Sequence, residues 1–188
     1  MHTLLGVVVV ASLAFVGSMF DNFFTFAAQL VVTDRAKYRR VSWAQGAGVA
    51  TLVALAAGVG SALSPIPLAL VGLLSVVLFA LGVHAWRQRR QPRAAPYRRG
   101  AVTTFTMTLA LGGDNLAVWI PLLRANGLAH AFVIVATFAL WEVVFLASAQ
   151  WMTRRPLVVT WSTRHAPAIV PAVYFALGVL TLFECGIL

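Results

Sequence analysis

The chain has 188 residues, of which 61% are hydrophobic and only 10% are charged. A soluble domain carries roughly 25% charged residues, so this composition excludes an ordinary soluble protein and indicates a small membrane protein. The net charge of +9 does not indicate nucleic-acid binding, because the fourteen lysines and arginines lie in short segments between apolar runs. A single cysteine, Cys185, excludes an intramolecular disulfide and any CxxC redox or zinc motif.

Apolar segments of membrane-spanning length follow one another along the whole chain. We predict an all-α membrane protein with six transmembrane helices, near residues 3–33, 41–62, 68–86, 101–123, 128–152 and 166–187. The first segment is too long for one straight span, so we expect it to be tilted or broken near Gly17–Asp21. A basic, proline-containing loop separates the two halves, and the predicted division is therefore 1–86, 87–100 and 101–188 within one membrane domain.

The distribution of basic residues predicts the topology. The loops after the first, third and fifth predicted spans hold thirteen of the fourteen lysines and arginines, and only Arg124 lies in an even-numbered loop. By the positive-inside rule the odd-numbered loops are cytoplasmic, so both termini are expected outside. With three spans per half, the second half is then inverted relative to the first.

The two halves also share a short motif. Asp21-Asn22 lies in the first predicted span and Asp114-Asn115 in the fourth. At 1.5 Å per helical residue, both aspartates lie about 15–20 Å from a membrane face, near the midplane. Inverted repeats with sites at the midplane, on interrupted helices, are typical of secondary transporters.

The segment around Asp114 has the strongest signs of function. Gly112 and Gly113 each weaken a helix by about 1 kcal/mol relative to alanine, and Pro121 removes a backbone donor. Such a stretch can open its backbone at membrane depth when the freed carbonyls find a ligand. A charge at the bilayer centre costs at least about 2.5 kcal/mol, so Asp114 is a candidate functional residue.

No predicted span contains a lysine or arginine that could neutralise these aspartates, so a cation or protons must do so. At a separation of about 4 Å, Asp21 and Asp114 would repel each other by about 4 kcal/mol at an effective dielectric constant of 20, which favours one shared proton. A divalent cation would displace that proton. Its predicted ligands are oxygens of Asp21, Asn22, Asp114 and Asn115, with backbone carbonyls near Gly112 and Gly113.

Two further acidic residues lie in apolar surroundings. Glu142 is in the middle of the fifth predicted span, and Glu184 is near the outer end of the sixth. Each could carry protons or form a second cation station, and Glu184 could also be an interfacial residue that reaches water. The polar residues Gln29, Gln45 and Gln150 are expected to make hydrogen bonds between helices.

The chain resembles the CadD-type cadmium-resistance transporters of the lysine-exporter (LysE) superfamily. The residues that carry the resemblance are Gly112-Gly113-Asp114-Asn115 with Val118 and Pro121, Asp21, Arg35-Ala36-Lys37, Gln45-Gly46, Ser148-Ala149-Gln150 and Gly178–Glu184. The resemblance spans nearly the whole chain and implies efflux of a divalent metal, with cadmium as the name-giving substrate. It makes Asp21, Asp114, Asn115 and Glu184 candidate site residues, whereas Glu142 is not part of the family's pattern.

We therefore expect an exporter of a divalent metal, not an enzyme, in the cytoplasmic membrane of a bacterium. Proton antiport is one mechanism that could drive the export, and the sequence leaves the energy coupling open. No cofactor is expected; the metal is the transported substrate, and a homo-oligomer is compatible with the sequence. An oxygen site suits manganese, calcium or magnesium as well as zinc or cadmium, which leaves the ion open. One alternative is an exporter of a small amino acid or organic cation. The other is an intramembrane aspartyl protease, although Leu111 stands where that family's motif has its first glycine.

Overall fold

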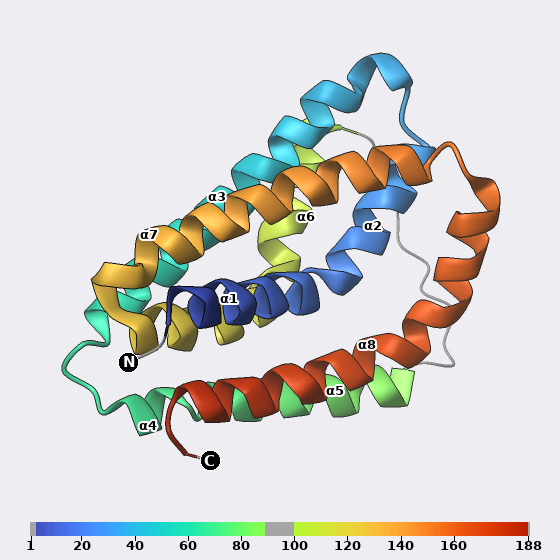
Figure 1. Cartoon of the computed structure of the whole chain (residues 1–188). Helices are drawn as coiled ribbons and strands as arrows, with labels where there is room; N and C mark the ends of the chain where they lie inside the picture. Colours follow the sequence, from blue (N-terminus) through green and yellow to red (C-terminus); the bar gives the residue numbers. More distant parts are fainter. Residues whose placement is uncertain (1–2, 89–99, 188) are drawn as a thin grey trace.

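The computed structural model describes residues 3–88 and 100–187, with the side chains of residues 69, 88, 128 and 156–168 left undescribed. Every regular element in these residues is helical, which confirms the predicted all-α class. The elements are α1 (Leu4–Ser18), α2 (Phe20–Val31), the 3-10 turn η1 (Arg35–Lys37), α3 (Tyr38–Ala62), α4 (Leu68–Val71), α5 (Leu74–Gln88), α6 (Ala101–Leu111), α7 (Gly113–Met152) and α8 (Pro156–Glu184) (Figure 1).

The first apolar segment is broken, as predicted. It forms α1 and α2, which meet at Met19 and are bent by 52° relative to each other. The two residues before Met19 are glycine and serine, both poorer helix formers than alanine. The break therefore lies at the weakest point of the segment, two residues before Asp21.

A second break separates α6 from α7 at Gly112, in the stretch where the glycines predict a weak helix. Gly112 is required there for packing, because a Cβ at this position would overlap the side chain of Leu52 on α3. Gly113 has no such neighbour. The Gly112 carbonyl accepts a hydrogen bond from the Leu116 N–H at 3.1 Å, which leaves its second lone pair for a ligand.

Helix α7 itself consists of two parts that join at Gly127, whose φ of 64° lies in the left-handed region. Only glycine adopts this conformation without strain. The chain reverses there, visible in Figure 1 as the turn between the yellow and orange parts of α7. The second part, Ala129–Met152, corresponds to the predicted fifth span.

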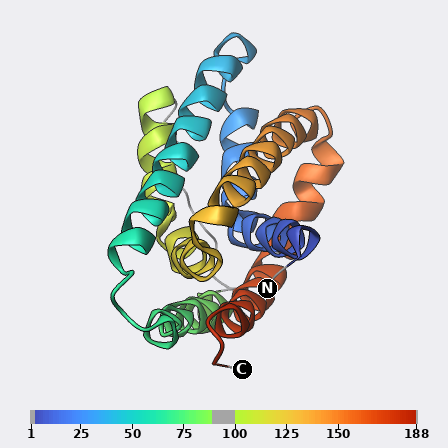
Figure 2. The same cartoon turned by 60° about the vertical axis from the view of Figure 1, so that its left-hand side comes forward.

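The longer helices pack side by side in pairs. In both views, α1 lies beside the first part of α7 and runs in the opposite direction, while α5 lies beside α8 and α3 beside the second part of α7 (Figures 1 and 2). Among the described residues, two helices are long and apolar enough to cross a membrane, Arg35–Ala62 and Ala129–Met152. The bent pair α1–α2 makes a third if it counts as one span.

The six-span inverted repeat, the outside termini and the division at residues 87–100 therefore remain predictions. Two boundaries also differ from expectation: the third segment contains the short α4 before α5, and α8 begins at Pro156 instead of near residue 166. Most of the predicted basic loop, residues 89–99, lies outside the described residues.

Aromatic packing holds α1 against both parts of α7. Phe15 stacks on the fully buried Trp119 with ring centroids 5.8 Å apart, and Trp119 meets Phe138 at 4.9 Å. Such pairs contribute about 0.5–1.5 kcal/mol each beyond the burial of their area. The Trp119 indole N–H also donates a hydrogen bond to Ser18 Oγ at 3.1 Å. These contacts keep the two helix breaks close together.

Hydrogen bonds between helices fix α6 in the same way. Gln29 on α2 donates to Thr104 on α6 at 2.6 Å, and Thr108 on α6 donates to Gln45 on α3. Gln150 on α7 donates to Ser42 on α3 at 3.0 Å. All three glutamines thus make the interhelical hydrogen bonds that the sequence predicts.

Candidate metal site

Both motif aspartates lie in the first turn of a helix that begins at a break. Asp21 is at the start of α2, and Asp114 is at the start of α7. The first turn of a helix has unpaired N–H groups and the positive end of the helix dipole, which stabilise a carboxylate by about 0.3–1 kcal/mol. The Asn22 N–H accordingly donates to Asp21 Oδ1 at 2.8 Å. The two halves therefore present their aspartates in the same local setting.

Tyr174 on α8 connects the two aspartates. Its hydroxyl lies 2.8 Å from Asp114 Oδ2 and 3.2 Å from Asp21 Oδ2, so these two oxygens are no more than about 6 Å apart. A tyrosine hydroxyl has one proton and can donate to only one of them at a time. The second contact is favourable when the other carboxyl is itself protonated. The geometry thus fits the predicted pair with one shared proton.

The two asparagines contact the same residue, Met19, at which α1 and α2 meet. The side-chain amides of Asn22 and Asn115 point their Nδ2 atoms at Met19 Sδ, at 3.8 Å and 3.4 Å. Met19 is only 2% exposed, and both asparagines are buried. A thioether, a soft donor atom, therefore lies among the polar side chains of both halves.

Two oxygens of this cluster have no hydrogen-bond partner. They are Asp114 Oδ1 and Asn115 Oδ1, on residues that are 5% and 0% exposed. A buried acceptor without a partner costs about 1–3 kcal/mol, so these atoms are positioned to bind a ligand. With the carboxylate of Asp21 they form an oxygen-rich set from both halves, suited to a cation.

The remaining candidate residues lie elsewhere. Glu184 accepts a hydrogen bond from Asn126 Nδ2 at 3.2 Å, near the C-terminal end of α8. Both carboxylate oxygens of Glu142 lack a hydrogen-bond partner, and this side chain lines a cavity between α3 and α7. In the part of the chain that the structure describes, no three His, Cys, Asp or Glu side chains group closely enough to bind a metal. A cation at the aspartate pair would therefore depend on amide, hydroxyl or thioether donors as well.

Tyr174 and Met19 are not among the residues singled out from the sequence. For Tyr174 a signal existed: a tyrosine in an apolar segment needs a partner for its hydroxyl. For Met19 none existed, because a methionine in an apolar run is indistinguishable from core. Its position beside the two asparagines depends on how the two broken helices pack.

A family model described as cadmium resistance transporter matches residues 93–188, about half of the chain. The matched region contains Asp114, Asn115 and Tyr174 but not Asp21 or Met19. Neither a curated protein nor a solved structure matches the chain.

Proposed function

Because this chain belongs to the cadmium resistance transporter family, we propose that it exports a divalent metal cation across the bacterial cytoplasmic membrane. The site would be formed by Asp21, Asn22, Asp114 and Asn115, near the midplane. The observation that carries the proposal is the contact of one hydroxyl, that of Tyr174, with the carboxylates of both halves. This contact supports a single site with two carboxylates, from residues that lie 93 positions apart in the sequence.

The transport cycle follows from the charge of this site. Without metal, one shared proton and the Tyr174 hydroxyl hold the two carboxylates together. A divalent cation supplies two positive charges, displaces the proton and takes the unpaired oxygens of Asp114 and Asn115 as ligands. Binding of a proton from the outside then favours release of the metal, which makes the protein a proton antiporter.

The choice of ion follows from Met19. Magnesium and calcium select oxygen ligands, whereas a thioether favours softer metals. Met19 Sδ lies within 4 Å of the amides of Asn22 and Asn115, so it would lie close to an ion that these two asparagines bind. We therefore place cadmium first and zinc second, ahead of manganese, magnesium and calcium.

The alternatives are weaker. An amino-acid exporter needs a group that binds a substrate carboxylate, whereas this site presents two carboxylates of its own. An intramembrane aspartyl protease would also bring two aspartates together, so geometry does not separate it from a transporter. The matching family model describes transporters, which supports the transporter over the protease.

Transport by purified protein in liposomes tests the proposal. Liposomes that contain a fluorescent metal indicator should show protein-dependent cadmium uptake down an imposed concentration gradient, accompanied by proton movement in the opposite direction. Asp114→Asn should abolish the uptake, and Asp34→Asn should leave it unchanged, because Asp34 is exposed and pairs with Lys37. Absence of flux for cadmium, zinc and manganese alike, combined with cleavage of a membrane peptide, would refute the proposal in favour of the protease.

A further inference from the structure

Glu142 lies in a cavity of its own. It is 7% exposed, on the second part of α7, and neither of its carboxylate oxygens has a hydrogen-bond partner. The cavity has a volume of about 460 Å³ and lies between α3 and α7. A carboxylate in such surroundings pays the full cost of lost hydration. Glu142 therefore requires a cation or a proton.

The side chains that line the cavity show whether Glu142 is suited to a metal cation or to a proton. The other nine lining residues are glycine, alanine, valine or phenylalanine, so none can coordinate a metal and none is titratable. A divalent cation needs several ligands, and one carboxylate cannot supply them. A proton needs a single oxygen. Glu142 is thus suited to binding a proton and not a metal ion.

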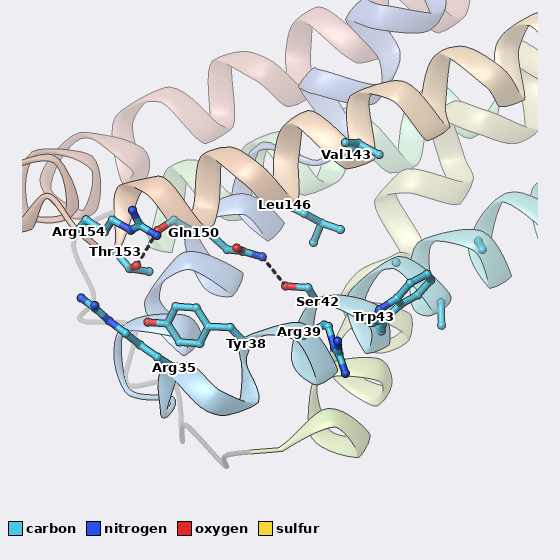
Figure 3. A pocket seen from close by; sticks show the side chains of 13 residues that line it. Arg35, Tyr38, Arg39, Ser42, Trp43, Val143, Leu146, Gln150, Thr153 and Arg154 are labelled. Atoms are coloured by element: carbon cyan, nitrogen blue, oxygen red, sulfur yellow. Dashed lines mark hydrogen bonds between the residues drawn. The ribbon is translucent and has the colours of Figure 1, made fainter.

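The cavity borders a second pocket. It shares Gly46 and Ala50 with a larger pocket of about 850 Å³ at the ends of α3 and α7. Arg35, Arg39 and Arg154 line that pocket, as Figure 3 shows, together with the hydroxyl of Tyr38. These arginines and Tyr38 are the titratable groups that line the larger pocket. Their positive charge disfavours passage of a metal cation.

We propose that Glu142 accepts the proton that the metal displaces from the aspartate pair and releases it to the cytoplasm through the cavity between α3 and α7. This inference rests on the proposed function, because metal binding at the aspartate pair supplies the proton. A proton taken up by one carboxylate oxygen leaves to water in the arginine-lined pocket. Metal and proton would then use different routes through one small molecule.

The first test separates metal binding from proton movement. Glu142→Gln keeps the size of the side chain and removes its titration. In liposomes it should retain cadmium binding and cadmium–cadmium exchange within about twofold of the unchanged protein, while proton movement driven by cadmium falls at least tenfold. Glu142→Asp should restore part of the proton movement.

Asp34→Asn is the control, since Asp34 is exposed and pairs with Lys37, and it should leave proton movement intact. Normal proton movement in Glu142→Gln, or loss of its cadmium binding, would overturn the proposal.

The second test does not depend on transport. Hydrophobic carbodiimides react with protonated carboxyl groups in apolar surroundings, and mass spectrometry locates the adduct. Glu142 should be labelled in membranes at neutral pH, with labelling that falls as the pH rises. An unlabelled Glu142 over the whole pH range would overturn the proposal. Labelling of Glu142 in a protein that moves no metal would instead show that the proposed function is wrong and the proton site is real.

Discussion

Replacement of Asp21 and Asp114 by asparagine, singly and together, provides the most informative test of the shared site. Their Oδ2 atoms are no more than about 6 Å apart, so two ionised carboxylates repel each other by about 3 kcal/mol at an effective dielectric constant of 20. Each single substitution removes this repulsion. We expect the free energy of unfolding of the metal-free protein to rise by up to about 3 kcal/mol, and by less to the extent that a proton is already shared.

The metal-bound state should change in the opposite direction. At a metal concentration of 100 times Kd, a bound ion stabilises the unchanged protein by about 2.7 kcal/mol. Either substitution removes a charge that a divalent ion needs, so most of this stabilisation should disappear. The double variant should be little worse than either single one, because residues that form one site are not additive. A variant that is more stable without metal, but is stabilised less by added metal, indicates that the two carboxylates repel each other in the metal-free protein and are needed to bind the ion.

Thermal unfolding in detergent, followed by tryptophan fluorescence with and without cadmium, measures both effects. For a chain of this length 1 kcal/mol corresponds to about 2–4 °C in Tm, so the expected shifts are readily resolved. Asp34→Asn is the control and should alter neither value, because Asp34 is 73% exposed. If Asp21→Asn keeps the full response to cadmium while Asp114→Asn loses it, the shared site is refuted and the metal belongs to α7 alone.

Three further outcomes are expected. Tyr174→Phe leaves the buried Asp114 carboxylate and the partly buried Asp21 carboxylate without their common donor, so Tm of the metal-free protein should fall by the equivalent of about 1–3 kcal/mol. The metal-bound protein should change less, and an equal loss in both states would contradict this role. Met19→Leu keeps the volume of the side chain but removes its sulfur atom, so titration calorimetry should show weaker cadmium binding and unchanged manganese binding. An equal loss of binding for both metals would show that Met19 contributes only packing. Reporter fusions after Leu63 and Asn126 should report a location outside the cell, because the odd-numbered loops hold thirteen of the fourteen basic residues. A cytoplasmic signal at either position would contradict the predicted inverted repeat.

Local composition was sufficient to predict the helix breaks. Gly17 and Ser18 weaken one apolar segment, and Gly112 and Gly113 weaken another, and the helices end at these positions. The interhelical role of the glutamines was equally predictable, since an amide in an apolar span must find a partner. The local sequence pattern could not show that the Gly112 carbonyl accepts a hydrogen bond from the Leu116 N–H. This bond forms because the break is only one residue long and α7 begins at the next residue.

The sequence by itself determined the class, the broken segments and the pairing of two Asp-Asn motifs, because hydropathy, glycine and buried charge act over a few residues. Only the tertiary structure decided which side chains meet at those motifs. Tyr174 lies 60 residues from Asp114 and 153 from Asp21, and Met19 is 96 residues from Asn115. Contacts over such separations depend on how α1, α7 and α8 pack against one another, and no local periodicity encodes that packing. The same holds for Glu142: its burial was predictable from its position in a span, but its isolation from any metal ligand follows from the apolar face of α3 that packs against it.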